Sequence, residues 1–179
     1  MMNQNPVLRE KDFSWIENLA LEELHMEESG FINFNPYSNI EKIIEESSLS
    51  FMNQLKDRFD FYVSLFNQHR LNRDQGRAIK TFRISNTIND FMLFRNSLKL
   101  IVARKNFDVI SIGFLSQSGN LFSPRLNQND NPMPQTQMFE IKAHVGAFNK
   151  ISWQYQGDEV EIESLVKFYL SDFIRFSAR

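Results

Sequence analysis

The side chains that could carry catalysis or bind a metal are few and far apart in this sequence. It has no cysteine, which excludes a thiol nucleophile and a Cys-ligated zinc or iron–sulfur site. Its three histidines, His25, His69 and His144, form no HxxxH, HExxH or HxH spacing. A nucleophile elbow, a P-loop and a dinucleotide-binding glycine pattern are absent as well. We therefore expect no catalytic residue, no metal and no cofactor. A cluster of distant His, Asp and Glu residues, or an enzyme of unknown class, stays an alternative.

The densest group of carboxylates lies just before the last predicted helix. Asp158, Glu159, Glu161 and Glu163 follow one another within six positions. Negative charge at this place is favoured by the positive end of the helix dipole. General acid–base catalysis instead needs a carboxylate whose pKa is shifted by an apolar pocket. We interpret this group as a solvated helix start.

The net charge of −2 conceals a strong segregation of charge along the chain. Residues 1–60 carry five Lys/Arg and 12 Asp/Glu, a net −7, whereas residues 61–105 carry nine and two, a net +7. Residues 106–179 carry six Lys/Arg and eight Asp/Glu, a net −2. A local excess of positive charge is typical of an anion-binding surface. The candidate anion- or nucleic-acid-binding residues are Arg73, Arg77, Lys80, Arg83, Arg95, Lys99, Arg104 and Lys105.

Aromatic residues within the basic segment favour single-stranded nucleic acid as the anion. Phe82, Phe91 and Phe94 could stack on bases while the cations neutralise phosphates. The alternation of Phe82 and Ile84 with Arg83 nevertheless predicts that the aromatic and the charged side chains face opposite sides of a strand. The acidic N-terminal helix could also neutralise the basic segment. Arg70, Arg73 and Arg77 are explained equally well as cations at the C-terminus of the long helix, where the negative end of the helix dipole favours them.

The longest predicted element is a helix over residues 39–72. Apolar residues recur along it at three-, four- and seven-residue intervals, and Ser38 with Glu41 resembles a capping box. About 33 helical residues span roughly 50 Å, which exceeds the diameter of roughly 40 Å expected for a globular chain of this length. We therefore expect the helix to project, bend or pair with another chain. The residues predicted to form its partner interface are Phe51, Leu55, Phe59, Tyr62 and Phe66.

The remaining pattern predicts an α+β fold. A first helix over residues 14–29 is preceded by a capping box of Ser14 and Glu17 and stopped by Gly30. Alternating apolar residues with short turns over 79–155 predict a mostly antiparallel sheet of about five or six strands. A loop over 116–137 interrupts the sheet, and an amphipathic helix over 161–178 closes it. We expect two parts: an acidic helix with its connector (1–37) and one α+β domain (38–179) with a long projecting helix (38–75).

These features favour a non-catalytic protein-interaction or scaffold protein. The apolar stripe of the long helix would join a second copy or a partner protein. The alternative is a single-stranded nucleic-acid-binding module that uses segment 70–105. No apolar run resembles a signal peptide or approaches the roughly 18 residues of a membrane helix, so we expect a cytoplasmic protein without a membrane partner.

Overall fold

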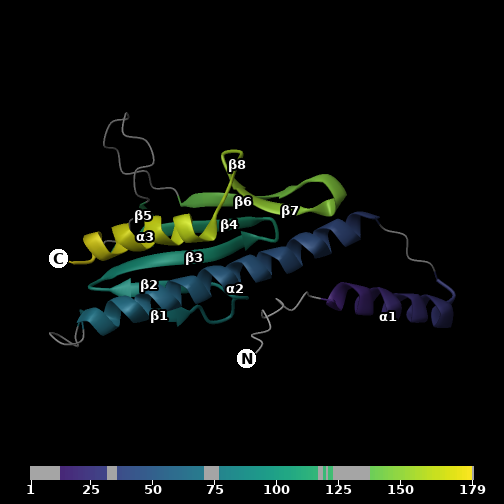
Figure 1. Cartoon of the computed structure of the whole chain (residues 1–179), viewed down its shortest axis with the longest axis horizontal. Helices are drawn as coiled ribbons and strands as arrows, with labels where there is room; N and C mark the ends of the chain where they lie inside the picture. Colours follow the sequence, from purple (N-terminus) through teal and green to yellow (C-terminus); the bar gives the residue numbers. More distant parts are fainter. Residues whose placement is uncertain are drawn as a thin grey trace, which may run out of the picture. The chain divides into compact units, whose positions relative to one another are not determined.

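The computed structural model describes residues 13–31, 36–70, 77–116, 119, 121–122 and 138–178. The chain divides into two units, Met1–Pro36 and Tyr37–Arg179. The described part of the first unit is the helix α1 (Ser14–Ser29). The helix α2 (Pro36–Arg70), eight strands and the helix α3 (Ile162–Phe176) follow it along the chain (Figure 1).

Helix α1 is terminated by a glycine but has no side-chain cap at its start. Phe13 occupies the N-cap position and no side chain caps it, so the predicted capping box of Ser14 and Glu17 is wrong because Ser14 is already helical. Gly30 adopts a left-handed conformation (φ 65°), and its N–H donates to the carbonyl oxygen of Met26 at 3.0 Å. Glycine reaches this conformation without steric cost, which confirms Gly30 as the end of the helix.

Helix α2 begins three residues earlier than predicted and is buried along one face. Its first residue is Pro36, which suits a first helical turn because the missing N–H would have no partner there. Ser38 therefore lies inside the helix and does not start a capping box. The buried face consists of Ile44, Ser48, Phe51, Met52, Leu55, Phe59 and Val63. At about 1.5 Å per residue the helix is roughly 52 Å long, and over 44–63 it packs on the sheet and does not project.

The sheet is an antiparallel meander, as predicted, with more strands than the five or six expected. The strands are β1 (Lys80–Arg83), β2 (Phe91–Arg95), β3 (Leu98–Asn106), β4 (Val109–Leu115), β5 (Leu121–Phe122), β6 (Phe139–Val145), β7 (Ile151–Tyr155) and β8 (Asp158–Glu159). Their order is β1-β2-β3-β4-β6-β7-β8, and β5 pairs with β4 beside β6. The two added strands, β5 and β8, have two residues each, too few to show an alternating pattern in the sequence.

The turn between β2 and β3 shows how the local sequence fixes the register. Asn96 and Ser97 both have positive φ angles, 46° and 70°, which is the geometry of a two-residue hairpin turn whose twist matches the strands. Arg95 then pairs with Leu98, and Phe91 with Val102. Because side chains alternate along a strand, this register places the apolar residues of both strands on one face.

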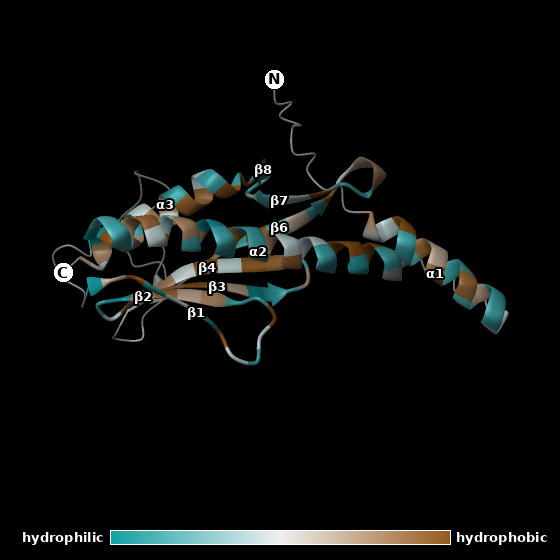
Figure 2. Ribbon diagram, turned by 60° about the horizontal axis from the view of Figure 1, so that its bottom comes forward, coloured by the Kyte–Doolittle hydropathy of each residue, from teal (hydrophilic) through white to brown (hydrophobic). Residues whose placement is uncertain are grey.

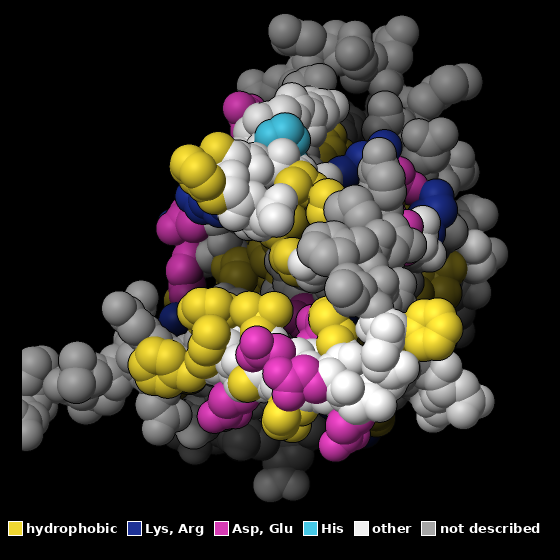
Figure 3. All heavy atoms as spheres, turned by 90° about the vertical axis from the view of Figure 1, so that its right-hand side faces the viewer, with side chains coloured by type: hydrophobic (Ala, Val, Ile, Leu, Met, Phe, Trp, Pro, Cys, Tyr) yellow, Lys and Arg dark blue, Asp and Glu magenta, His cyan; other side chains and the backbone are white. Residues whose placement is uncertain are grey.

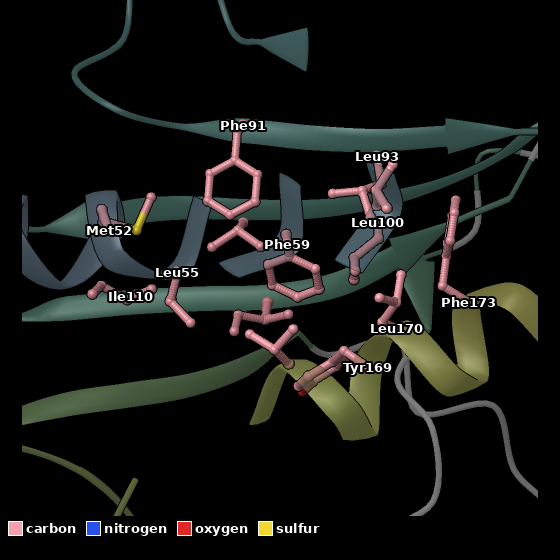
Figure 4. Close-up of a cluster of buried hydrophobic side chains, with 14 of the residues drawn as sticks. Met52, Leu55, Phe59, Phe91, Leu93, Leu100, Ile110, Tyr169, Leu170 and Phe173 are labelled. Atoms are coloured by element: carbon pink, nitrogen blue, oxygen red, sulfur yellow. The ribbon is translucent and has the colours of Figure 1, made fainter. Parts of the chain in front are cut away.

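Both α2 and α3 cover that apolar face. Phe59 of α2 lies with its ring centroid 5.8 Å from that of Phe91 on β2. Phe114 on β4 stacks on Phe173 of α3 at 6.4 Å. Figure 4 shows Phe59 beside Phe91 in this core, with Phe173 on the covering helix α3. The fold is therefore α+β with helices before the sheet and a closing helix after it, as predicted. The long helix joins α3 as a cover, whereas the sequence pointed to the terminal helix alone.

Two further sequence predictions concern membrane-spanning helices and the loop over 116–137. No helix in the described ranges combines the length and the apolar character needed to cross a bilayer. The predicted loop over 116–137 contains the short strand β5, and residues 117–118, 120 and 123–137 lie outside the described residues.

Candidate interaction surfaces

The predicted partner interface on α2 is wrong, because the sheet of the same chain covers it. Phe51, Leu55 and Phe59 have exposed fractions of 7%, 0% and 0%. Tyr62 and Phe66 are half-buried and pack against the same core. An apolar helical stripe marks a face that needs cover, and here the sheet supplies it. The ring of Phe51 stacks on Trp153 of β7 at 5.3 Å, and that of Phe59 lies 5.8 Å from Phe91 of β2. In Figure 2 the ribbon of α2 alternates between brown and teal, as expected for a helix with one buried face.

The predicted basic residues do not converge on one surface, and Arg95 is the clearest exception. Its exposed fraction is 2%. Its Nε donates to the carbonyl oxygen of Arg77 at 2.9 Å, and its Nη1 lies 3.5 Å from the carbonyl oxygen of Ile174 and 3.4 Å from Ser177 Oγ. The guanidinium also lies 5.4 Å from the centre of the Phe66 ring. Arg95 is therefore a structural residue, and its assignment to an anion-binding surface is wrong.

The position of Arg95 follows from the strand pattern. It lies two residues after Leu93 on β2, so it shares the buried face. Burial lowers the pKa of its guanidinium, and the neighbouring cations Arg70 and Arg77 lower it further. The carbonyl groups at the carboxyl end of α3 offset this cost, since the negative end of the helix dipole favours a cation.

Two other predicted cations are bound to residues of the same chain, a third precedes the sheet, and a fourth lies outside the described residues. Arg104 Nη1 lies 3.4 Å from Glu45 Oε1 and 3.0 Å from Ser48 Oγ, so it ties β3 to α2. Arg83 Nη1 donates to Asn89 Oδ1 at 3.2 Å on the helix-covered side of β1. Arg77 is exposed and precedes the sheet. Arg73 lies outside the described residues.

The face of the sheet opposite the helices carries the rest of the basic residues, and we call it the open face. No described helix of the second unit packs on it. The strand register places these residues on that side: Lys80, Phe82, Met92, Phe94, Lys99, Ile101, Ala103, Lys105, Val109, Ser111, Gly113, Leu115, Glu140, Lys142, His144, Ser152, Gln154 and Glu159. On β4 this side is itself covered, since Ser111 is only 7% exposed. Lys80, Lys99 and Lys105 were predicted as binding residues, and the structure brings them to this one face.

One end of the open face combines cations with aromatic rings. The register aligns Lys80, Phe94, Lys99 and Leu115 in a row across β1 to β4. The next row begins with Phe82, whose exposed fraction is 43%. The expectation that charge and aromatic rings face opposite sides holds for Arg83 and is wrong for Lys80 and Lys99. The prediction used only the alternation around Arg83 within one strand. The pairing of β1, β2 and β3 decides which side chains lie next to one another on a face of the sheet.

The other end of the open face is a hollow over β3, β4, β6 and β7 with a volume of about 1290 Å³. Lys105 Nζ lies 2.6 Å from Glu140 Oε1, and Lys142 Nζ lies 4.0 Å from Glu140 Oε2. The hydrogen bond and the charge of Lys105, with a smaller effect of Lys142, hold the pKa of Glu140 below its ordinary value. Glu140 therefore stays ionised at neutral pH and offsets part of the positive charge in the hollow.

The described residues of the first unit form a second surface, in which apolar and acidic side chains lie together. Seven large hydrophobic residues are at least 48% exposed: Phe13, Trp15, Ile16, Leu19, Leu21, Leu24 and Phe31. Residues 13–31 also contain five glutamates and neither lysine nor arginine. Figure 3 shows hydrophobic and acidic side chains next to one another in its lower part, where α1 faces the viewer.

The histidines and carboxylates of the described residues do not gather into a metal site. No set of three or more His, Asp or Glu side chains that could hold a metal ion occurs among them. His144 lies on the open face, while His25 and His69 are exposed on α1 and α2. Comparisons with protein-family models, with curated proteins and with solved structures find no match for this chain.

Two groups of surface residues were missed by the sequence reasoning although a signal was present. Lys142 and His144 alternate with Ile141 and Ala143, so the strand period already placed them opposite the apolar face. The apolar residues of α1 recur at helical spacing in the sequence, but no binding role was predicted for them. Counting the large apolar side chains in that helix would have raised the question of what covers them.

Proposed function

We propose that this protein is a non-catalytic interaction protein that binds a partner protein through α1. The observation that carries the proposal is the exposure of the apolar side chains of α1, with Leu19 at 49%, Leu24 at 53% and Trp15 at 62%. Such a concentration of exposed apolar surface marks an interaction site in a soluble chain. Partner proteins commonly bury the apolar anchors of a helix in an apolar groove.

The charge of α1 indicates the chemistry of that partner. The five glutamates of the helix would meet lysine or arginine side chains at the rim of the groove, where opposite charges speed association and exclude wrong partners. The same charge opposes binding to an anionic membrane, because membrane-surface helices carry Lys and Arg on their polar face. We therefore expect a protein with an apolar groove and a basic rim.

The length of α1 supports a helix that gains stability on binding. An isolated helix of 16 residues is marginally stable in water, since nucleation is costly and each residue adds little. In the free protein its backbone amides should exchange with deuterium much faster than those of α2 between Phe51 and Val63. Hydrogen exchange of the purified full chain, combined with light scattering to give the mass, tests this without knowledge of the partner.

The possible outcomes of that measurement separate the proposal from its rivals. Fast exchange over 14–29 in a monomer supports it. Slow exchange in a monomer means that α1 is already covered within its own chain, and slow exchange in a dimer means that a second copy covers it. Either result overturns the proposal.

The second test uses a substitution pair once a partner has been captured with the full chain as bait. The variant Leu19→Asp/Leu24→Asp should abolish binding of the purified partner, because two apolar anchors are lost. The matched control Leu65→Asp/Phe61→Asp adds the same charge at exposed apolar positions of α2 and should bind as the wild type does. Equal loss in both variants would show that added charge, not the α1 surface, weakens binding.

A further inference from the structure

We propose that the open face is a second binding surface, whose ligand is single-stranded nucleic acid. The proposal is independent of α1 and concerns the other unit of the chain. It is carried by the register of β1 to β3, which brings lysines and phenylalanines to the same side of the sheet, and by the chemical match of these side chains to phosphates and bases.

The aromatic part of the surface is formed by two rings on neighbouring strands. Phe82 on β1 is 43% exposed, and Phe94 on β2 is half-buried in the adjacent row. The flat side of a base stacks on such a ring whatever the base is, so recognition of this kind tolerates sequence. A duplex hides the faces of its bases, so stacking of this kind selects a single strand.

The cationic part of the surface flanks these rings. Lys80 and Lys99 lie on either side of Phe94 in one row, separated by two strand spacings of about 5 Å each, roughly 10 Å in all. No carboxylate occurs in this row of described residues. A base stacked on Phe94 would therefore have a lysine on each side for the neighbouring phosphates.

The hollow would extend the path of the bound nucleic acid toward β6 and β7. Lys105 and Lys142 are 65% and 67% exposed at their side chains, so both can contact phosphate. Glu140 lies between them, and Glu159 pairs with Gln154 at the far edge of the sheet. These carboxylates weaken the attraction at this end. We therefore place the stronger contacts at the end formed by β1 to β3.

The experiment measures binding of a fluorescein-labelled 20-nucleotide oligothymidylate and oligouridylate to the full-length protein by fluorescence anisotropy as a function of salt. A single strand that contacts two to four lysines gives a slope of log K against log salt of roughly −1.4 to −2.8. Phe82→Ala should weaken binding by about 5- to 150-fold, which corresponds to the loss of one stacked base. Phe61→Ala, at a ring on α2 that is 52% exposed, should leave binding unchanged.

Charge variants with equal net change separate the open face from the overall charge. Lys80→Gln/Lys99→Gln/Lys105→Gln removes three cations from the open face, including the two lysines beside Phe94, whereas Lys42→Gln/Arg83→Gln/Lys167→Gln removes three exposed cations elsewhere. The first variant should lose most of the affinity and flatten the salt dependence, and the second should retain both. Glu140→Gln frees two lysines and should strengthen binding several-fold at low salt.

Several results would overturn the proposal. They are the absence of binding at low salt, equal loss in the two triple variants, and equal affinity for a duplex of the same length. Binding of poly-glutamate as tight as that of the oligonucleotides would identify the open face as a site for acidic proteins. Circular dichroism of every variant checks that its fold is intact.

Discussion

Helices α1 and α2 follow each other in the chain and both carry apolar residues at helical spacing, yet they end in opposite environments. The apolar stripe of α2 is buried against the sheet, with ring contacts to Phe91 of β2 and Trp153 of β7. The apolar residues of α1 are exposed, and Trp15 and Leu21 point away from the stripe formed by Ile16 and Leu24, so more than one side of that helix is apolar. Periodicity thus shows that a face needs cover, but the covering element decides whether the face is core or interface.

The largest effect expected from this difference is a loss of stability when the stripe of α2 is truncated. Phe59→Ala removes a fully buried ring that packs 5.8 Å from Phe91 and should lower the free energy of unfolding by about 3–5 kcal/mol. Urea denaturation measures the change. A Phe59→Ala protein of unchanged stability that dissociates from a dimer to a monomer would restore the helix stripe as a partner interface.

The second effect concerns a contact that ties β2 to the end of α3. Arg95→Met keeps an apolar stem but leaves the carbonyl groups of Arg77 and Ile174 without their donor. Since hydrogen bonds to a charged group contribute about 1.5–3 kcal/mol, the unfolding free energy should fall by about 2–3 kcal/mol. An unchanged free energy of unfolding in thermal and urea denaturation would contradict this. It would mean that the cost of burying the Arg95 charge equals the stabilisation by its hydrogen bonds. Arg83→Met, at an exposed cation, serves as the control.

A smaller effect comes from the bond between α2 and α3. Tyr62 Oη donates to Glu163 Oε2 at 2.8 Å, and this bond, with burial and the charge of Glu163, raises the pKa of Tyr62 above 10.0. A group whose pKa is raised by folding contributes stability below its unfolded pKa and loses it as the pH rises through the folded value. The free energy of unfolding of Tyr62→Phe should therefore be lower than that of the wild type at neutral pH. The two free energies should converge above pH 10. A difference that stays constant up to pH 11 would exclude this bond as its source.

The smallest effect is expected in α1. Leu24→Ala removes a half-exposed side chain, so the unfolding free energy should stay within about 0.5 kcal/mol of the wild type. Urea denaturation monitored by the fluorescence of the buried Trp153 is suited to this test. A loss of 2 kcal/mol or more would show that α1 is covered in the free protein, and the contrast with α2 would disappear.

The sequence was sufficient for the parts of the fold that depend on local periodicity. The three helices, the glycine stop at Gly30 and the antiparallel meander all follow from spacing and turn residues. The two-residue strands β5 and β8 could not be predicted, because they exist only through their pairing with β4 and β7. The start of α2 at Pro36 was missed because a capping pattern at Ser38 competed with a proline that suits the first turn.

The surfaces were predicted less well, because they depend on which strands pair. Arg95 and Lys99 are close in the sequence, but β2 carries the first to the buried face and β3 carries the second to the open face. A charge excess over a stretch of sequence therefore says little about a charge excess on a surface. The burial of Phe51, Leu55 and Phe59 also needed the sheet, since nothing within α2 distinguishes a sheet of the same chain from a partner.

The strand order bears on the sequence of events in folding. Most strands that pair in the sheet also follow each other along the chain. β1 to β4 can therefore form as consecutive hairpins, each of which closes only a short loop. The pairing of β4 with β6 must wait for the closure of a much longer segment, and the packing of α2 needs a sheet that already presents its apolar face. We expect the β2–β3 hairpin to form early. A slower step should follow, in which α2 packs on a nearly complete sheet.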